Sequence, residues 1–176
     1  MTTRPTKSDP EIAGALFGSD LSQAMATARA RREGWVATEV DPLTVVVEMA
    51  AKRGDARDAY YVKLEGDWYN QYPPRVTFVA PDPVAGWPEA IDGTRWLPSL
   101  LQTNPGFALH PAYEFPDRTR HQLVCSSINL DYYWTHAPEP GKCWIPGKTK
   151  LIWTLSVIQD ELAGPGYAGT SDAANS

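Results

Sequence analysis

The sequence predicts an α+β fold in which a helix precedes four closely spaced strands and a second helix follows a long proline-rich segment. Leucine and isoleucine recur at helical spacing near the C-terminus, at Leu151, Leu155, Ile158 and Leu162. Short β-branched runs recur earlier in the chain. Twelve of the 16 prolines lie between residues 73 and 146, where they interrupt regular structure.

The first helix is expected over Leu21–Glu33. Ser19-Asp20 offers an N-cap before it, and Gly34 offers a C-terminal stop after it. Residues 1–18 are then expected to form a flexible N-terminal arm.

Four strands follow at intervals too short for crossover helices, which predicts an antiparallel meander. They are expected at 35–40, 43–51, 59–64 and 75–80. The segment 81–116 has no clear periodicity, and a loop of this length in a compact domain is usually functional. Its two tryptophans and nearby leucines are expected to pin it to the body (Trp87, Trp96, Leu97, Leu100 and Leu101).

A short strand is expected at 122–124, immediately before Cys125. The clearest helix covers Lys148–Leu162 and is stopped by Gly164-Pro165-Gly166. The small and polar residues that follow predict a disordered tail over 164–176.

Composition excludes several classes of function. The net charge is −5, so the basic surface of a nucleic-acid-binding protein is not expected. No apolar run reaches the roughly 18 residues of a membrane span, and Met1–Pro10 lacks the apolar region of a secretory signal. Two cysteines do not make a disulfide framework, which favours reduced thiols and a cytoplasmic protein.

The reactive side chains are concentrated in one part of the chain. Both cysteines and all three histidines lie between residues 110 and 143 (His110, His121, Cys125, His136 and Cys143). Only His121 and Cys125 have a spacing typical of metal ligands, so the sequence supports zinc poorly and neither a metal nor another cofactor is expected.

Five motifs in order resemble the ubiquitin-conjugating (UBC) family. Tyr69–Phe78 is similar to the family's Y-P-x-x-P-P-x-V-x-F, and His110-Pro111 to the start of its H-P-N tripeptide. Cys125 stands where the family places its catalytic cysteine. Trp144–Pro146 resembles the W-x-P that follows this cysteine, and Ser156–Gln159 resembles a helical S-I-Q motif.

The resemblance covers roughly residues 20–162, assigns 19–163 to a UBC-like domain and points to bacterial relatives found in antiphage and ubiquitin-like conjugation operons. It departs from the family at three points. Ala112 replaces the asparagine that stabilises the oxyanion, and Asn70 replaces the first proline of the first motif. Cys125 is 15 residues after His110 and 19 before Trp144, so two insertions flank it.

The resemblance implies a thioester carrier. Cys125 would accept the C-terminus of a ubiquitin-like protein from an activating enzyme and pass it to a lysine of a protein target. With Ala112 in place of the usual donor, another side chain must stabilise the oxyanion, and the candidates nearby in sequence are Asn129, His121 and His136. We expect Asn129 first, because its amide is a donor of the same kind.

Three arginines end the first predicted helix, namely Arg29, Arg31 and Arg32. Positive charge in a last turn suits the helix dipole, so they are either a solvated helix end or a docking face for an acidic partner. Under the UBC hypothesis this helix would face the activating enzyme.

Other interpretations remain open from the sequence. Ala112 favours a catalytically silent UBC-like module that binds a ubiquitin-like protein or scaffolds a complex. A cysteine–histidine hydrolase would need Cys125 to meet His136 or His121, with an acid such as Asp131 to orient the histidine. Cys143, beside Trp144, is expected to be a packing residue. The aromatic segment 131–136 predicts either a recognition surface or a lid.

Overall fold

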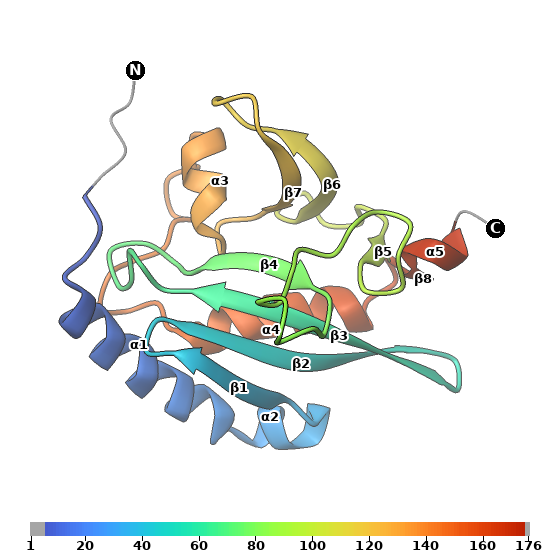
Figure 1. The fold of residues 1–176 in the computed structure, drawn as a ribbon, viewed down its shortest axis with the longest axis horizontal. Helices are drawn as coiled ribbons and strands as arrows, with labels where there is room; N and C mark the ends of the chain where they lie inside the picture. The colour runs from blue at the N-terminus through green and yellow to red at the C-terminus, as the bar shows by residue number, and fades with distance from the viewer. Residues whose placement is uncertain (1–5, 175–176) are drawn as a thin grey trace.

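Four antiparallel strands, paired in sequence order, form the central sheet of the computed structural model, which describes residues 6–174 (Figure 1). Two helices precede the sheet: α1 (Pro10–Met25) and α2 (Ala28–Glu33). The strands are β1 (Val36–Asp41), β2 (Thr44–Arg53), β3 (Ala56–Glu65) and β4 (Arg75–Val79). The predicted α+β class, the antiparallel meander and the two flanking helices are confirmed.

The rest of the chain adds two small sheets and three helices. They are β5 (Pro98–Leu100), β6 (Ala108–Glu114), β7 (Arg120–Cys125), α3 (Leu130–Thr135), α4 (Leu151–Ala163), β8 (Tyr167–Thr170) and α5 (Ser171–Ala174). β5 pairs with β8, and β6 pairs with β7, both antiparallel.

One face of the sheet is buried because apolar residues alternate along its strands. Its core side chains are Val45, Val47, Met49, Tyr60, Val62, Leu64, Val76 and Phe78, each at most 2% exposed. α1 and α4 pack against each other, and both contribute residues to the core on this side (Figure 1). Gln159 of α4 fixes the packing by accepting from the Trp35 indole at 2.7 Å and donating to the Ala50 carbonyl at 2.9 Å.

The first helix begins earlier than predicted. Asp9 caps α1, because its carboxylate accepts from the backbone N–H groups of Glu11 and Ile12. Residues 10–18 are therefore helical rather than part of an arm, while residues 1–5 lie outside the described part of the chain. Asp20 is not a cap: it is 3% exposed, accepts from the Tyr69 hydroxyl and lies 3.3 Å from the Lys150 ammonium.

The predicted helix over 21–33 is also divided in two. The chain leaves α1 after Met25, and the Thr27 hydroxyl caps α2 by accepting from the Ala30 N–H at 3.1 Å. The predicted stop at Gly34 is confirmed, since this glycine caps α2 with a φ of 74°.

The proline-rich segment after β4 crosses the sheet on the side away from α4 (Figure 1). Trp87 and Trp96 both pack on Tyr61 of β3, with ring centroids 6.1 and 5.9 Å away. Leu97 is fully buried, as expected, but the side chain of Leu101 is 63% exposed and does not hold the segment against the domain.

The C-terminal tail is ordered through residue 174, contrary to the expected disorder. β8 pairs with β5, and Tyr167 hydrogen-bonds to Tyr60 at 2.7 Å and donates to the Asp58 carboxylate. An interior aromatic residue with hydroxyl partners outweighs the small and polar composition that suggested disorder.

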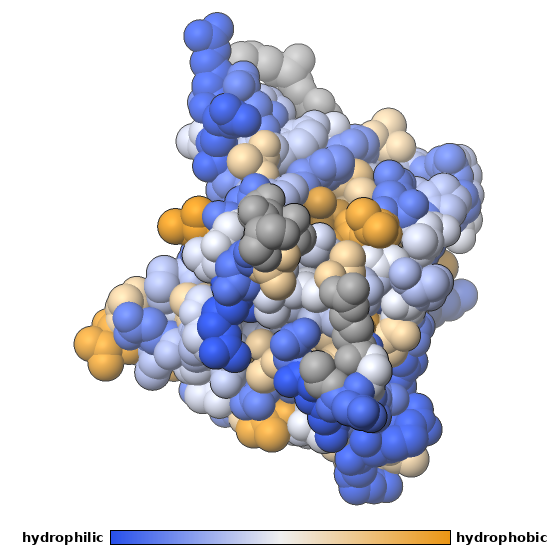
Figure 2. Space-filling model, turned by 90° about the vertical axis from the view of Figure 1, so that its right-hand side faces the viewer, coloured by the Kyte–Doolittle hydropathy of each residue, from blue (hydrophilic) through white to orange (hydrophobic). Residues whose placement is uncertain are grey.

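The outer surface is polar at the end of the molecule that carries the β2–β3 turn and α5. Figure 2 shows apolar groups there in small patches separated by hydrophilic ones. Within residues 6–174, no helix combines the length and the apolar character needed to cross a membrane.

The β6–β7 hairpin and α3 lie beyond the edge of β4 (Figure 1). Gln122 of β7 is 4% exposed, and its amide accepts from the Phe78 N–H at 2.7 Å. The same amide donates to the Phe78 and Ala90 carbonyls at 2.8 and 3.2 Å. The Gln122 side chain thus makes hydrogen bonds to the main chain of β4 of the kind that a neighbouring strand would make.

Replacing Gln122 with methionine should lower the free energy of unfolding by about 2–4 kcal/mol, because the Phe78 N–H and the Ala90 carbonyl lose buried partners. Urea unfolding followed by fluorescence measures the change. The control is Arg120→Met on the exposed end of the same strand, expected within about 0.5 kcal/mol of the unsubstituted protein. Equal stability of the two variants would contradict the docking role of Gln122.

Candidate active site

Cys125 ends β7 at a partly exposed position, in register with Ala108 of β6. The predicted short strand before it is confirmed and is longer than expected. The Cys125 sulfur lies 3.6 Å from Nε2 of His136, within hydrogen-bonding distance for a thiol. The structure therefore brings together two of the four residues that the sequence nominated for catalysis.

His136 owes its position to α3, which the sequence analysis did not predict. It is the C-cap of this helix, and its backbone N–H donates to the Tyr132 carbonyl at 2.8 Å. Its ring stacks on the Tyr132 ring, with centroids 5.0 Å apart and an angle of 15° between the planes. Nδ1 lies 2.8 Å from the Thr135 hydroxyl. The ring is thus held on one face and at one nitrogen, with Nε2 directed at the thiol.

The surroundings of this pair disfavour charge on both partners. Burial raises the pKa of the Cys125 thiol above its ordinary value. Burial, and then the nearby His110, lower the pKa of His136. Near neutral pH the pair is therefore a neutral thiol facing a neutral imidazole, and not a thiolate–imidazolium pair.

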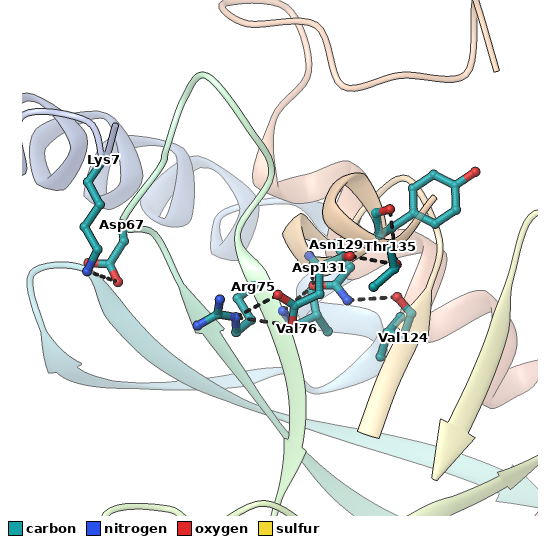
Figure 3. Close-up of polar contacts among 9 residues, drawn as sticks. Lys7, Asp67, Arg75, Val76, Val124, Asn129, Asp131 and Thr135 are labelled. Carbon is teal, nitrogen blue, oxygen red and sulfur yellow. Dashed lines mark hydrogen bonds and ion pairs between the residues drawn. The ribbon is translucent and has the colours of Figure 1, made fainter. Parts of the chain in front are cut away.

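Asn129 is a structural residue and not the predicted oxyanion donor. Its side chain is fully buried, accepts from the Val76 N–H of β4 at 2.9 Å and donates to the Val124 carbonyl at 2.8 Å (Figure 3). It also caps α3 through the Asp131 N–H. A buried amide bound to the backbone cannot turn toward a substrate at Cys125, so nearness in sequence was misleading.

His121 does not face the thiol in this structure. Its ring stacks on Phe115, with centroids 3.9 Å apart and an angle of 8° between the planes. Four residues separate it from Cys125 along β7, which is about 13 Å of extended chain. The catalytic role proposed for His121 is therefore not supported by the geometry.

The histidines nonetheless cluster for a structural reason. Tyr113 of β6 lies between them, with its ring centroid 5.7 Å from that of His110 and 6.2 Å from that of His136. Phe115 packs on Tyr113 at 5.4 Å and carries His121 on its other side. An aromatic row on the hairpin therefore connects all three imidazoles to the neighbourhood of Cys125.

Asp131 does not orient either histidine. It is 5% exposed and pairs with the Arg75 guanidinium at 3.1 Å, which joins α3 to β4 (Figure 3). Arg75 also lies over the Trp134 ring at 5.5 Å. The residue that contacts His136 in the orienting position is Thr135, which the sequence analysis missed because a helix end was not recognised there.

The aromatic segment 131–136 combines features of both structural interpretations. Tyr133 and Trp134 pack inward: Tyr133 donates to the Ser127 carbonyl at 2.9 Å, and Trp134 lies 4.9 Å from Trp68. Tyr132 and His136 lie nearer the surface beside Cys125. The segment is thus a helix packed on the domain that presents one side at the thiol.

Cys143 is separate from this pair and is also partly exposed. Its thiol donates to the Glu139 carbonyl at 3.3 Å, and it lines a cavity of about 190 Å³ with Trp153. Two larger cavities, of about 360 and 260 Å³, lie between α1 and the β1–β2 turn and beside β5. Cys125 lines none of these three cavities, and it is partly exposed.

The three arginines lie at the end of the molecule opposite α3 (Figure 1). Arg29 pairs with Asp160 of α4, and Arg31 donates to the Ala26 carbonyl at 2.8 Å. Arg32 contacts its neighbour Glu33 at 3.3 Å, and its side chain is 69% exposed. Two of the three therefore support the packing of α2, and their proposed contact with an activating enzyme stays a prediction.

Neither a comparison with protein-family models nor one with curated protein sequences gives a match to the chain. Within residues 6–174, no three His, Cys, Asp or Glu side chains form a group that could hold a metal ion.

The neutral pair predicts the pH dependence of alkylation at Cys125. In a Cys143→Ala background, iodoacetamide labelling should rise with a midpoint above the ordinary thiol pKa of 9.0, because burial raises the pKa of Cys125. Intact mass spectrometry at timed intervals gives the rates, and Cys125→Ala in the same background is the blank. A rate that is already at its plateau at pH 7 would instead show a thiolate–imidazolium pair and contradict this description.

Proposed function

We propose that this chain is a UBC-type acyl carrier, in which Cys125 receives the C-terminus of a ubiquitin-like protein as a thioester and passes it to an amine. Its partners would be the ubiquitin-like protein, an activating enzyme and a protein target with an acceptor lysine. Under this proposal the reaction would take place in the cytoplasm, and the chain would belong to a bacterial antiphage or ubiquitin-like conjugation operon.

The positions of the UBC-like motifs support the proposal. Residues 69–78 lead from β3 into β4, and His110 lies on β6 opposite Leu123 of β7. Trp144 is 5% exposed and donates to the Asn70 carbonyl at 3.0 Å, which joins the W-x-P segment to the first motif. Gln159 of the helical motif is buried and bonded to Trp35. Residues of these motifs thus make structural contacts within one domain.

The observation that carries the proposal is the open Cys125–His136 pair. A carrier must be reached by two proteins in turn, and a partly exposed thiol at a strand end allows this. In loading, His136 Nε2 takes the thiol proton while sulfur attacks the activated carbonyl. A C–S bond to Cys125 forms, and the bond between the carbonyl carbon and the thiol of the donor breaks. The donor thiol then leaves with that proton.

The same histidine can serve the second step. Its return to the neutral form leaves Nε2 free to accept a proton from the attacking amine. The new amide bond forms, and the thiol is regenerated. Ala112, at the irregular register of β6 between His110 and Tyr113, cannot donate a hydrogen bond through its side chain. His136 therefore supplies proton transfer, and the side chain of Asn129 supplies none.

A cysteine–histidine hydrolase is the second candidate, because the same Cys125–His136 contact would serve it. The two functions differ in the acceptor of the acyl group, which is water in a hydrolase and an amine in a carrier. The partly exposed position of Cys125 favours the carrier, because a carrier thiol must be reached by two protein partners in turn.

A peptide thioester separates the candidates without knowledge of the natural partner. The protein in a Cys143→Ala background is incubated with a short peptide ending in Gly-Gly as an alkyl thioester. We expect an acyl adduct on Cys125 by intact mass, cleaved by added thiol and discharged faster by free lysine than by buffer alone. Cys125→Ser should give a thiol-resistant ester, and His136→Gln should slow loading by about 10²-fold.

Each alternative has its own outcome in this experiment. Rapid release of free peptide acid without lysine would replace the carrier by a hydrolase. If no adduct forms although iodoacetamide alkylates Cys125 in a parallel sample, the result would favour the catalytically silent binding module. An adduct that survives Cys125→Ala would contradict the assignment of the reactive residue.

A further inference from the structure

The Thr135 hydroxyl contacts three polar atoms but has only one hydrogen to donate. Its oxygen lies 2.9 Å from the Asp131 carbonyl, 3.3 Å from the Tyr132 carbonyl and 2.8 Å from Nδ1 of His136. Carbonyl oxygens can only accept. If the hydroxyl hydrogen pointed to Nδ1, the Thr135 and Asp131 oxygens would face each other at 2.9 Å with no hydrogen between them.

In the favourable arrangement the Thr135 hydroxyl therefore donates its hydrogen bond to the Asp131 carbonyl, one helical turn back. A lone pair of the Thr135 oxygen then accepts a hydrogen from Nδ1. A neutral imidazole carries one N–H, so Nε2 of His136 is left without a hydrogen and with a lone pair directed at the Cys125 sulfur, 3.6 Å away.

We propose that Thr135 is a positioning residue that holds His136 in the Nδ1–H tautomer, which makes Nε2 the acceptor of the Cys125 proton. Without this contact, the hydrogen could reside on Nε2 and point at the thiol, and the base would be lost. The inference deepens the proposed function, on which its catalytic meaning rests, but the tautomer itself can be measured without acyl transfer.

The surroundings of His136 favour one neutral form at neutral pH. The groups that face it are Tyr132 on α3, His110 and Tyr113 on β6, and Cys125 on β7. Beyond Tyr132 lie Glu139, Lys142 and Cys143 of the following loop. Glu139 and Lys142 form an exposed ion pair with each other at 2.6 Å. None of the groups that face the imidazole directly is a carboxylate that would stabilise an imidazolium.

Nitrogen-15 NMR of the histidine side chains at pH 7.5 tests the proposal directly. We expect a protonated-type signal from Nδ1 and an unprotonated-type signal from Nε2 of His136, which is assigned by its loss in His136→Gln. Thr135→Ser keeps the hydroxyl and should keep this pattern. Thr135→Val has nearly the same shape but no hydroxyl, and should shift His136 toward the Nε2–H tautomer.

The rate at which Cys125 is loaded from the peptide thioester in the Cys143→Ala background provides the second readout. At pH 7.5 we expect Thr135→Val to lower this loading rate about 10²-fold, as far as His136→Gln does, and Thr135→Ser to restore it. Urea unfolding midpoints of all variants separate this effect from loss of the fold. A merely structural Thr135 would change the midpoint without moving the histidine signals.

Two results would overturn the inference. One is an Nε2–H pattern for His136 in the unsubstituted protein, which is decisive even if Thr135→Val does not fold. The other is an unchanged Nδ1–H pattern in folded Thr135→Val. Failure of the peptide thioester to load, together with the expected tautomer, would instead remove the carrier function and leave the role of Thr135 intact.

Discussion

The outer edge of β4 is the constraint on which the site depends. β3 pairs with one side of this strand, and the other side would otherwise leave main-chain groups without partners. Part of that side pairs with the main chain of residues 88–90, where the Ala90 N–H donates to the Phe78 carbonyl at 2.9 Å. Side-chain amides add to this pairing: Gln122 binds Phe78 through both of its polar atoms, and Asn129 accepts from the Val76 N–H. The Leu130 N–H adds a bond to the Pro74 carbonyl at 3.1 Å. Because Gln122 binds this edge through its side chain, β7 is docked without joining the sheet.

This docking determines where the reactive groups lie. Asn129 binds β4 and also begins α3, so the start of that helix is tied to the sheet. The ion pair between Arg75 and Asp131 adds a second tie in the first turn. The helix is only six residues long, and its C-cap, His136, therefore lies about 10 Å along the axis from Asn129. Length and anchoring together bring this ring beside Cys125.

Much of the fold could be predicted from residue patterns, because the signals were local. The apolar run of β2, the alternation in β3 and the helical spacing in α4 reflect the burial of their apolar side chains, which is why these elements were predicted correctly. The start of α1 was missed because Asp20 was misjudged as the cap, although Asp9-Pro10 is itself a good helix start. The ordered tail depends on a long-range contact between Tyr167 and Tyr60, which no local pattern reveals.

The site shows the same division. Cys125 and His136 were nominated from sequence, but their contact depends on α3, a helix shorter than a periodic pattern can reveal. Asn129 was misassigned because nearness in sequence does not show where a side chain points. Its capping position and its bond to β4 are visible only in three dimensions. Thr135 was missed for the complementary reason: threonine in a helix end is common, and only the three distances around its oxygen give it meaning.

A neutral pair has consequences that a charged pair would not. The raised pKa of Cys125 and the lowered pKa of His136 both keep the proton on sulfur in the resting protein, so the thiol is a poor target for small oxidants and alkylators. Proton transfer to Nε2 becomes favourable only as sulfur begins to bond to a carbonyl carbon, because donation of a sulfur lone pair to that carbon makes the S–H proton more acidic. Under the proposed function, the partly exposed Cys125 would meet large partners in succession and would benefit from this order of events. Accessibility and low resting reactivity are thus compatible at Cys125, because the base beside it is neutral.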